Sequence, residues 1–452
     1  MHFTKRLLDA QVPVARVVVA IAAAGSLTAS CSSVEDSTHP AVGPDASLPD
    51  EPLVDGGVLD AEPPGLDAGA PGLDAAKWDA GAVRPVVCAS ARCATSLTTT
   101  FGEGFCALLR DGTVACWGQN NAGQLGRGQH AGTNDGRTAE RVVGVEGVVE
   151  LARSCAIDSA GATWCWGTGP FLRSELSATT TELTPVKLPI PPATKVGVAE
   201  RTACAVVDGG VLCWGENSNG QIAVPELGAN AALSPRAITI PPGAPITSLF
   251  VGSASFVLRA DGTVVSWGAN PPLARVSSLF PDPYPRDIQL ASVSSMGVDR
   301  KAACATADGT AYCWGLVRER AEVGAGQLGS VLLERALPRP IVTPEPVVQI
   351  ATASDGSVAA LLERACACGV SGDVHCWGNN ASGQVGDGTK AYALAPVRVA
   401  GLPEPAAQVK TSARSTCALL TSGRVFCWGD NMYGQLGSGR QQSLVPVEIV
   451  LP

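Results

Sequence analysis

A pattern that recurs seven times constrains this sequence more than any other feature. A Trp-Gly pair closes a short apolar run in each repeat, and successive pairs lie 49, 48, 53, 47, 63 and 51 residues apart. Such a period is typical of β-propeller blades, which are small sheets stacked around a centre. The sequence therefore predicts an all-β propeller. The pairs begin at Trp117, Trp166, Trp214, Trp267, Trp314, Trp377 and Trp428.

Cysteines at fixed places in the repeats predict cross-strand disulfides. If Cys204 faces Cys213 in a hairpin, Asp208-Gly209 remains as a two-residue loop, and Asp-Gly favours the type I′ turn. The longer repeats then have three-residue loops that end in glycine, which best adopts the left-handed third position. Directly opposed strand residues lie within disulfide range. The six predicted pairs are Cys106–Cys116, Cys155–Cys165, Cys204–Cys213, Cys304–Cys313, Cys366–Cys376 and Cys417–Cys427.

The same rule selects between two neighbouring cysteines in the sixth repeat. Cys366, rather than Cys368, is assigned to Cys376 because only this pairing places Gly372 third in the loop. Cys368 is then expected to be a small buried apolar residue rather than a reactive thiol.

The remaining cysteine positions bear on the cellular compartment. The fourth repeat has Phe256 and Ser266 at the two positions and so loses both members of the pair together. Cys88 and Cys93 are candidates for a seventh bridge. Sixteen cysteines in this regular arrangement predict an oxidising compartment.

The N-terminus predicts export. Basic residues precede an apolar run at 17–24, and small residues precede Cys31; this is the organisation of a signal peptide, and the run is too short to span a bilayer. The stretch Leu27-Thr28-Ala29-Ser30-Cys31 resembles a bacterial lipobox, with Thr28 where that pattern usually has Leu. We therefore expect cleavage before Cys31 and diacylglycerol on its thiol, with a plain cleaved signal peptide as the alternative. By the same resemblance, Ser32 favours the outer membrane.

Three regions are expected along the chain. Residues 1–30 form a lipoprotein-type signal peptide. Residues 31–85 are rich in Pro, Ala, Gly and Asp and have almost no periodic apolar pattern, so they predict a disordered tether behind the lipidated cysteine. Residues 86–452 hold the propeller.

Charge limits the class of partner. Charged residues make up 16% of the chain, the formal net charge is -9, and no cluster of Lys and Arg follows the first sixteen residues. Nucleic-acid binding needs a basic surface, so none is expected. Electrostatic adsorption to anionic lipid is not expected either, and membrane attachment should depend on the lipid anchor alone.

One full repeat reads Cys106-Ala107-Leu108, Gly112-Thr113-Val114, Cys116-Trp117-Gly118 and Asn120-Asn121-Ala122-Gly123-Gln124-Leu125-Gly126. Its last four letters return at 326–329 and 434–437, and as Gly-Gln-Val-Gly at 383–386. These motifs resemble the regulator of chromosome condensation repeat over about residues 86 to 452. The resemblance implies a seven-bladed propeller of four-stranded antiparallel blades, in a cysteine-bearing form similar to that of exported bacterial proteins.

Two further expectations concern how the blades join. The tryptophan row is interpreted as packing between blades rather than as an aromatic ligand site. The segment 445–450 resembles the strand that begins each repeat, and it is expected to close the ring against the first blade.

The repeats depart from the motif in places. Gly-Gln-Leu-Gly is degraded to Gly-Gln-Ile-Ala at 220–223 and is absent from the second and fourth repeats, where longer segments stand at 168–184 and 271–286. A third insert, at 316–339, follows the fifth Trp-Gly pair. Long inserts on one face of a repeat scaffold are where binding usually resides, while neutral surface loops are the alternative, and both interpretations stay open.

These features favour a non-catalytic binding scaffold on the cell envelope. It would recognise a protein or a cell-surface polymer through loops on one propeller face. We expect a monomer without cofactor or metal, lipid-anchored to the bacterial outer membrane or cell surface, or alternatively periplasmic or secreted.

A hydrolase or another enzyme with a pocket in the propeller is the alternative. His130 or His375 would serve as the base of a Ser/His/Asp site, but neither lies in a nucleophile-elbow context, and His375 is expected to be packed on a strand. The sequence has no Walker loop, no His-Glu-x-x-His and no finger-like Cys/His spacing. Guanine-nucleotide exchange could be inferred only from the name of the fold family, and a fold does not by itself imply an activity. We therefore expect no enzyme.

Overall fold

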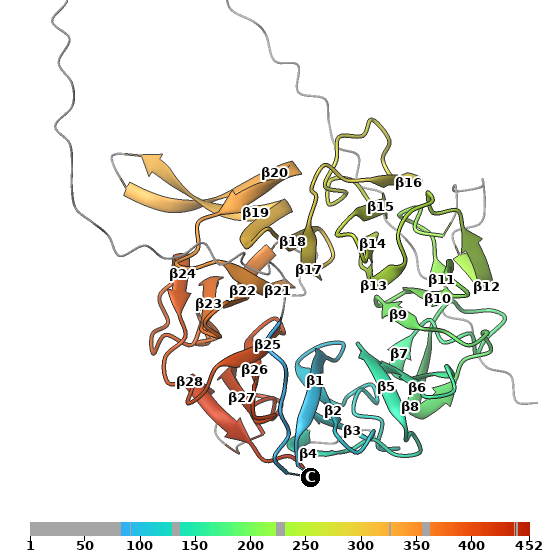
Figure 1. Ribbon diagram of the computed structural model, residues 1–452, viewed down its shortest axis with the longest axis horizontal. Helices are drawn as coiled ribbons and strands as arrows, with labels where there is room; N and C mark the ends of the chain where they lie inside the picture. Colours follow the sequence, from blue (N-terminus) through green and yellow to red (C-terminus); the bar gives the residue numbers. More distant parts are fainter. Residues whose placement is uncertain are drawn as a thin grey trace, which may run out of the picture. The chain divides into compact units, whose positions relative to one another are not determined.

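The computed structural model describes residues 83–90, 92–128, 136–222, 231–324, 327–354, 362–437, 439 and 442–452. All of them belong to one compact unit, Asp74–Pro452. The predicted signal peptide, Cys31 and the predicted tether up to residue 82 lie outside the described residues. In the described part, seven blades of four antiparallel strands form a ring (Figure 1), so the predicted fold is confirmed.

Each blade is built from four strands that follow one another along the chain and run from the centre of the ring outward. The first strands are β1 (Ala94–Thr99), β5 (Val148–Ala152), β9 (Lys195–Val198), β13 (Ile246–Val251), β17 (Val293–Val298), β21 (Val347–Ser354) and β25 (Ala406–Thr411). The second strands are β2 (Gly104–Leu109), β6 (Cys155–Asp158), β10 (Thr202–Val207), β14 (Ala254–Arg259), β18 (Ala302–Ala307), β22 (Leu362–Gly369) and β26 (Ser415–Leu420).

The outer half of each blade completes the sheet. The third strands are β3 (Val114–Gly118), β7 (Thr163–Gly169), β11 (Gly210–Glu216), β15 (Val264–Gly268), β19 (Thr310–Gly324), β23 (Val374–Gly378) and β27 (Val425–Asp430). The fourth strands are β4 (Gly136–Arg141), β8 (Thr180–Lys187), β12 (Ala231–Ile238), β16 (Asp282–Asp287), β20 (Gln327–Ile341), β24 (Ala393–Arg398) and β28 (Gln442–Ile449).

Loop chemistry sets the register between second and third strands. In blade three, Cys204 lies opposite Cys213, and Val207 lies opposite Gly210. Asp208 and Gly209 between them have φ angles of 49° and 76°, as a type I′ turn requires. The glycines at the third position of the longer loops have φ angles between 77° and 86°. The predicted turns are therefore confirmed.

Blades five and six are joined more closely than the others. β19 and β20 have 15 residues each, and β19 pairs with β22 in parallel at Val317 and Leu362, so the two blades share one eight-stranded sheet. The insert at 316–339 therefore lengthens a β-hairpin, which projects from the ring in Figure 1.

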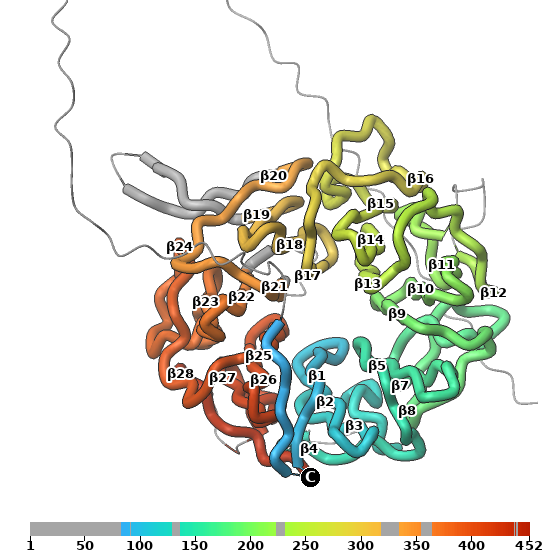
Figure 2. The backbone as a smooth tube through the Cα atoms, viewed as in Figure 1, coloured from blue at the N-terminus to red at the C-terminus, as the bar shows by residue number. Residues whose placement is uncertain are grey.

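The ring closes between the seventh and first blades. The segment 445–450 is expected from the sequence to close the ring against the first blade, but β28, which contains most of it, pairs with β27 as the outer strand of blade seven. Its end does reach the first blade: Ile449 shares a core cluster with first-blade residues. The indole N–H of Trp117 donates to the carbonyl of Gln435 at 3.1 Å. The segment before β1 runs beside blade seven (Figure 2), where the N–H of Val87 donates to the carbonyl of Thr421 at 2.7 Å.

Candidate functional site

Seven disulfides cross-link the described residues. Six join the second and third strands of a blade at the pairs predicted from loop chemistry, with Cα atoms 4.0–4.1 Å apart. The seventh joins Cys88 to Cys93. This many disulfides indicate an extracellular or otherwise oxidising compartment.

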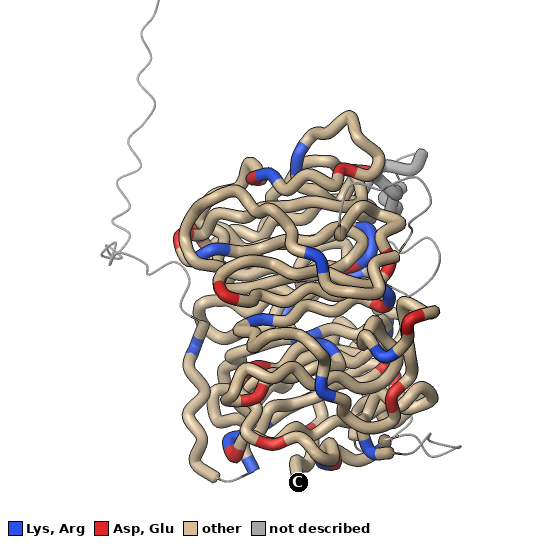
Figure 3. The backbone as a smooth tube through the Cα atoms, turned by 90° about the vertical axis from the view of Figure 1, so that its right-hand side faces the viewer, with Lys and Arg blue, Asp and Glu red and all other residues tan. Residues whose placement is uncertain are grey.

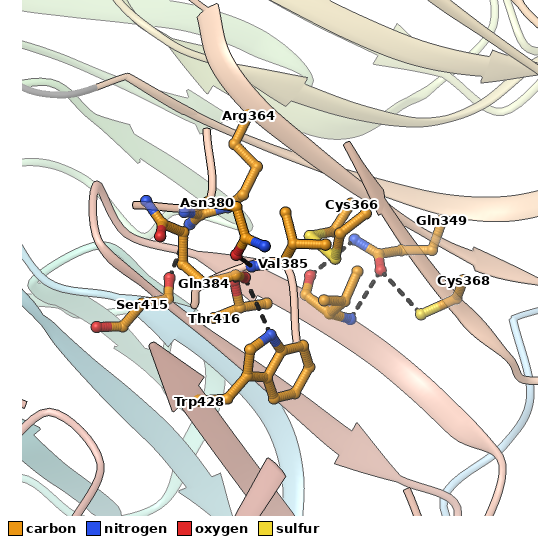
Figure 4. Close-up of a disulfide and its surroundings, with 12 residues drawn as sticks. Gln349, Arg364, Cys366, Cys368, Asn380, Gln384, Val385, Ser415, Thr416 and Trp428 are labelled. Atoms are coloured by element: carbon orange, nitrogen blue, oxygen red, sulfur yellow. Dashed lines mark hydrogen bonds between the residues drawn. A yellow bond between two sulfur atoms is a disulfide. The ribbon is translucent and has the colours of Figure 1, made fainter. Parts of the chain in front are cut away.

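Cys368 is the free cysteine of the described residues, and it is fully buried. Its Sγ lies 3.5 Å from Oε1 of Gln349, while the neighbouring Cys366 carries the disulfide to Cys376 (Figure 4). Burial raises the pKa of the Cys368 thiol to about 12, so the thiol stays protonated and unreactive. The expectation of a buried, inert cysteine is confirmed.

The tryptophans of the Trp-Gly pairs pack between blades. Six of the seven are fully buried, and the indole N–H of each donates to a backbone carbonyl of the preceding blade in the ring, at 2.5–3.1 Å. Figure 4 shows Trp428 bonded in this way to Gln384. The interpretation of the row as packing between blades is confirmed.

The Asn-x-x-Gly-Gln-x-Gly segment presents these carbonyls. In the sixth repeat, Asn380 Oδ1 accepts the N–H of Val385 at 2.9 Å, and Gln384 Oε1 accepts a second N–H of the same loop at 2.7 Å. Gly386 has a φ of 84°, and a Cβ at this position would lie 2.5 Å from Nε1 of Trp428. The motif therefore joins neighbouring blades.

Two repeats that lack the motif still provide a backbone carbonyl for the tryptophan of the next blade. Trp214 donates to the carbonyl of Pro170 at 2.5 Å, and the buried Phe171 follows it. Trp314 donates in the same way to the carbonyl of Pro272 at 2.8 Å, and the buried Leu273 follows it. The sequence motif does not reveal these two sites, because a backbone carbonyl and one buried apolar side chain can be supplied by many residue types.

In the fifth repeat the motif is present but lies in a strand. It has Gly-Gln-Leu-Gly at 326–329, but Gln327 begins β20 and the residues after it continue that strand. Trp377 of the next blade is only partly buried, and it packs with Ile341 against a core cluster that blades five and six share. The junction between blades five and six thus differs from the others.

The fourth blade builds a loop where other blades have a disulfide. Phe256 and Ser266 face each other at the cysteine positions. Ser266 Oγ donates to the carbonyl of Leu273 at 2.6 Å, and Arg275 Nη2 donates to the carbonyl of Ser266 at 3.3 Å. Arg275 also pairs with Asp282 at 2.5 Å, with both side chains almost fully buried. We call residues 269–281 the blade-four loop; it is held from inside by these contacts.

Hydrogen bonds keep the buried Asp282, the first residue of β16, charged. Burial alone would raise the pKa of the Asp282 carboxyl, but hydrogen bonds from Arg275, Ser277 and the backbone N–H of Tyr284 hold it below its usual value. The ion pair therefore stays intact at neutral pH.

Apolar side chains project from the blade-four loop. Val276 is 76% exposed and Phe280 71%, and Leu279 and Tyr284 beside them are also exposed. Scattered exposed apolar residues are ordinary, but a group of them on one fixed loop is typical of an interaction surface.

Strand direction places the three inserts on one face. Because consecutive strands are antiparallel, the connections from first to second strand and from third to fourth strand lie at the same end of every blade. The inserts at 168–184, 271–286 and 316–339 all stand between, or extend, third and fourth strands. We call this side the insert face. The Asp-Gly turns lie on the opposite side, the hairpin face.

A cavity of about 590 Å³ opens at the centre of the insert face. Its wall consists largely of connections between first and second strands. Glu200 forms an ion pair with Arg300, and Arg201 forms one with Glu216. The charges of these four wall residues are therefore neutralised in pairs, and the mouth of the channel is polar without a strong net charge.

The histidines offer no catalytic arrangement in the described part of the chain. His375 is 4% exposed, as its predicted packing requires, and burial lowers its pKa. His130 lies outside the described residues. Within the described ranges no group of three or more His, Cys, Asp and Glu side chains could hold a metal ion, and no helix has the length and hydropathy that a membrane crossing needs.

Charged residues of both signs are interspersed on the side of the propeller seen in Figure 3. Among the residues drawn there, Lys and Arg do not gather into the continuous stripe that a phosphate backbone requires.

Sequence models of the regulator of chromosome condensation (RCC1) repeat match residues 103–124, 371–419, 406–435 and 422–452. The ultraviolet-B receptor UVR8 of Arabidopsis thaliana is 26% identical over 364 residues, which cover 74% of this chain and 76% of UVR8. The human E3 ubiquitin-protein ligase HERC2 is 27% identical over 246 residues, which cover 50% of this chain and only 5% of HERC2.

Solved structures share the architecture. Prp20p from Saccharomyces cerevisiae and human WBSCR16 each superpose with a TM-score of 0.59 at 18% identity. The superpositions cover 79% and 75% of this chain, and 87% and 95% of those proteins. At this identity the likeness concerns the fold alone. The chain thus matches RCC1 repeat models in its first and last two repeats and folds as a seven-bladed propeller.

Proposed function

We propose that this chain is a non-catalytic protein-binding propeller of the cell envelope, which holds its partner against the insert face. The blade-four loop carries the proposal, because it presents Val276, Leu279 and Phe280 on a frame fixed by the buried Arg275–Asp282 pair. A fixed frame lowers the entropy lost when exposed apolar side chains bind a partner. The aliphatic members of the group favour a protein over a polar surface polymer.

The relatives leave the partner open. UVR8 is an ultraviolet-B receptor, and Prp20p has binding properties toward Gsp1p and histones. The same repeat therefore serves different partners in different proteins, and fold likeness does not select among them. We propose no exchange activity for this chain.

The envelope part of the proposal rests on the sequence and on the disulfides. The predicted lipid at Cys31 and the predicted tether would hold an oxidised propeller away from the membrane. Cys31→Ala is expected to move the protein from the membrane fraction to the soluble fraction, as measured by fractionation and immunoblotting. Retention of the variant in the membrane would exclude Cys31 as the anchor.

Affinity capture tests the binding face. The purified, oxidised protein is immobilised and exposed to envelope and medium proteins of the source organism, and captured proteins are quantified by mass spectrometry. V276S/F280S should reduce capture of one specific protein by about tenfold or more, which corresponds to about 1.4 kcal/mol.

Val342→Ser is the matched control. Val342 is 90% exposed and follows β20 on the hairpin face, so this variant should capture the partner as the unmodified protein does. Equal capture by V276S/F280S and the unmodified protein would contradict the proposed face.

A further inference from the structure

The waist of the central channel is a ring with one residue from each blade. On every first strand, this residue stands opposite the cysteine position of the second strand, so the register of the blades defines the ring. Four of the seven have no side chain beyond a methyl group, which keeps the channel open. The ring consists of Thr98, Ala152, Gly197, Phe250, Gly297, Ala351 and Lys410.

A cavity of about 150 Å³ occupies this waist, and all seven ring residues line it. It adjoins the larger cavity at the insert face, because Thr99, Arg153 and Thr352 belong to both walls. The valine, leucine, isoleucine and methionine residues that border it are largely buried in the blade cores, so its apolar surface comes mainly from Phe250 and Ala152 of the ring. The waist is therefore a small chamber of mixed polarity that is reached through a polar mouth.

Two cations line this chamber, and among the described residues the acid Glu150 acts on Lys410 only from outside its wall. Arg153 and Lys410 line it, and no acidic residue of the described chain does. The Arg153 guanidinium lies 5.5 Å above the ring of Phe101, a cation–π contact that leaves its charge uncompensated. The nearby Glu150 is already paired with Lys195 at 2.9 Å.

The surroundings of Lys410 show the cost of this arrangement. Burial lowers the pKa of the Lys410 ammonium, and the charge of Arg153 lowers it further. Thr352 and Thr411 also border the chamber. Two like charges in a confined space are stabilised when an anion enters.

We propose that the channel waist binds a small aliphatic carboxylate. Its carboxylate lies between Arg153 and Lys410, which provide charge-assisted hydrogen bonds, and its hydrocarbon body packs against Phe250. An inorganic anion would leave this ring without a partner. This site is separate from the blade-four loop and does not depend on the proposed protein partner.

Butyrate and butyramide test the proposal on the purified, oxidised protein. Binding to the folded state raises Tm, so butyrate at constant ionic strength should raise Tm in a concentration-dependent way, while the uncharged butyramide should not. Calorimetry should show that Lys410→Met and Arg153→Met each weaken butyrate binding by about tenfold or more, the size expected when a charge-assisted hydrogen bond is lost. Lys301→Met removes a cation of the mouth and should leave butyrate binding unchanged.

A peptide that ends in a free aliphatic carboxyl group, compared with its C-terminal amide, distinguishes the two sources of such a ligand. Tighter binding of the free-acid peptide than of butyrate would identify a polypeptide terminus, and binding of butyrate alone would identify a small metabolite. Equal shifts of Tm by butyrate and butyramide would overturn the site, as would unchanged butyrate binding in both Lys410→Met and Arg153→Met. V276S/F280S should bind butyrate normally, so failure of the binding face and failure of this site are distinguishable.

Discussion

The fourth blade and its six neighbours hold the same register by different means. Six blades join their second and third strands through a buried disulfide. In the fourth, the fully buried Phe256 packs edge to face on Trp314, with ring centroids 6.1 Å apart, and Ser266 bonds to the loop beyond it. Packing thus replaces a covalent bond, and the position freed from the disulfide supports an insert.

This difference bears on function. A disulfide uses both facing side chains for the strands themselves, whereas Ser266 keeps a hydroxyl that anchors Leu273, and the backbone carbonyl of Ser266 receives Arg275. The blade without the covalent cross-link is the blade that presents Val276 and Phe280. In blade four, the serine that stands at a cysteine position supports a shaped loop, while blades two and five carry their inserts beside an intact disulfide.

Phe256→Ala should have the largest effect. It removes a buried aromatic ring and leaves a cavity in a blade that has no disulfide, so we expect a loss of about 3–5 kcal/mol in the free energy of unfolding. Urea denaturation of the oxidised protein measures this loss. A loss below about 1 kcal/mol would mean that packing does not replace the disulfide in this blade.

Asp282→Asn should act on the loop itself. The substitution leaves the buried Arg275 without its counter-ion, with an expected loss of about 3 kcal/mol and faster hydrogen exchange across residues 271–281. R275M/D282L removes both charges and should recover most of the stability, because an unpaired buried charge is the main cost. If the double variant were no more stable than Asp282→Asn, the ion pair would not be what holds the loop.

C417A/C427A tests a blade that has its disulfide. Removing a cross-link that closes a loop of about ten residues should cost about 2–3 kcal/mol. The same denaturation measurement applies, and exchange in the blade-four loop should be unchanged. Faster hydrogen exchange in the blade-four loop of this variant would show that blades four and seven are not independent.

The smallest effect should come from the tryptophan N–H. Trp428→Phe removes a buried hydrogen bond to Gln384 and should cost about 1 kcal/mol beyond the change in packing. Trp377→Phe, at the junction of blades five and six, should cost less, because this ring is only partly buried. Equal losses in the two variants would argue that these two junctions are equivalent.

Contacts set by short loops were predictable from the sequence, whereas contacts between residues of different blades were not. The disulfide pairs follow from loops such as Asp208-Gly209, because a two-residue turn fixes which residues face each other. The carbonyl of Pro170 that accepts Trp214 could not be found in this way, since any residue supplies a carbonyl.

The candidate sites depend on arrangement in space. Arg275 and Asp282 stand in an insert whose sequence suggests only a loop, and their burial follows from contacts with Ser266. Arg153 and Lys410 come from blades two and seven, and they face one chamber only because seven first strands converge on one axis. A single sequence has no local pattern that reports such a meeting.

Hydrogen–deuterium exchange of the protein with and without its captured partner tests the binding face most directly. Bound partner should protect backbone N–H groups in peptides that cover 199–201, 271–281 and 299–301 on the insert face, and should leave the Asp-Gly turns at 208–209 and 308–309 unchanged. Protection confined to those turns would place the partner on the hairpin face and contradict the account.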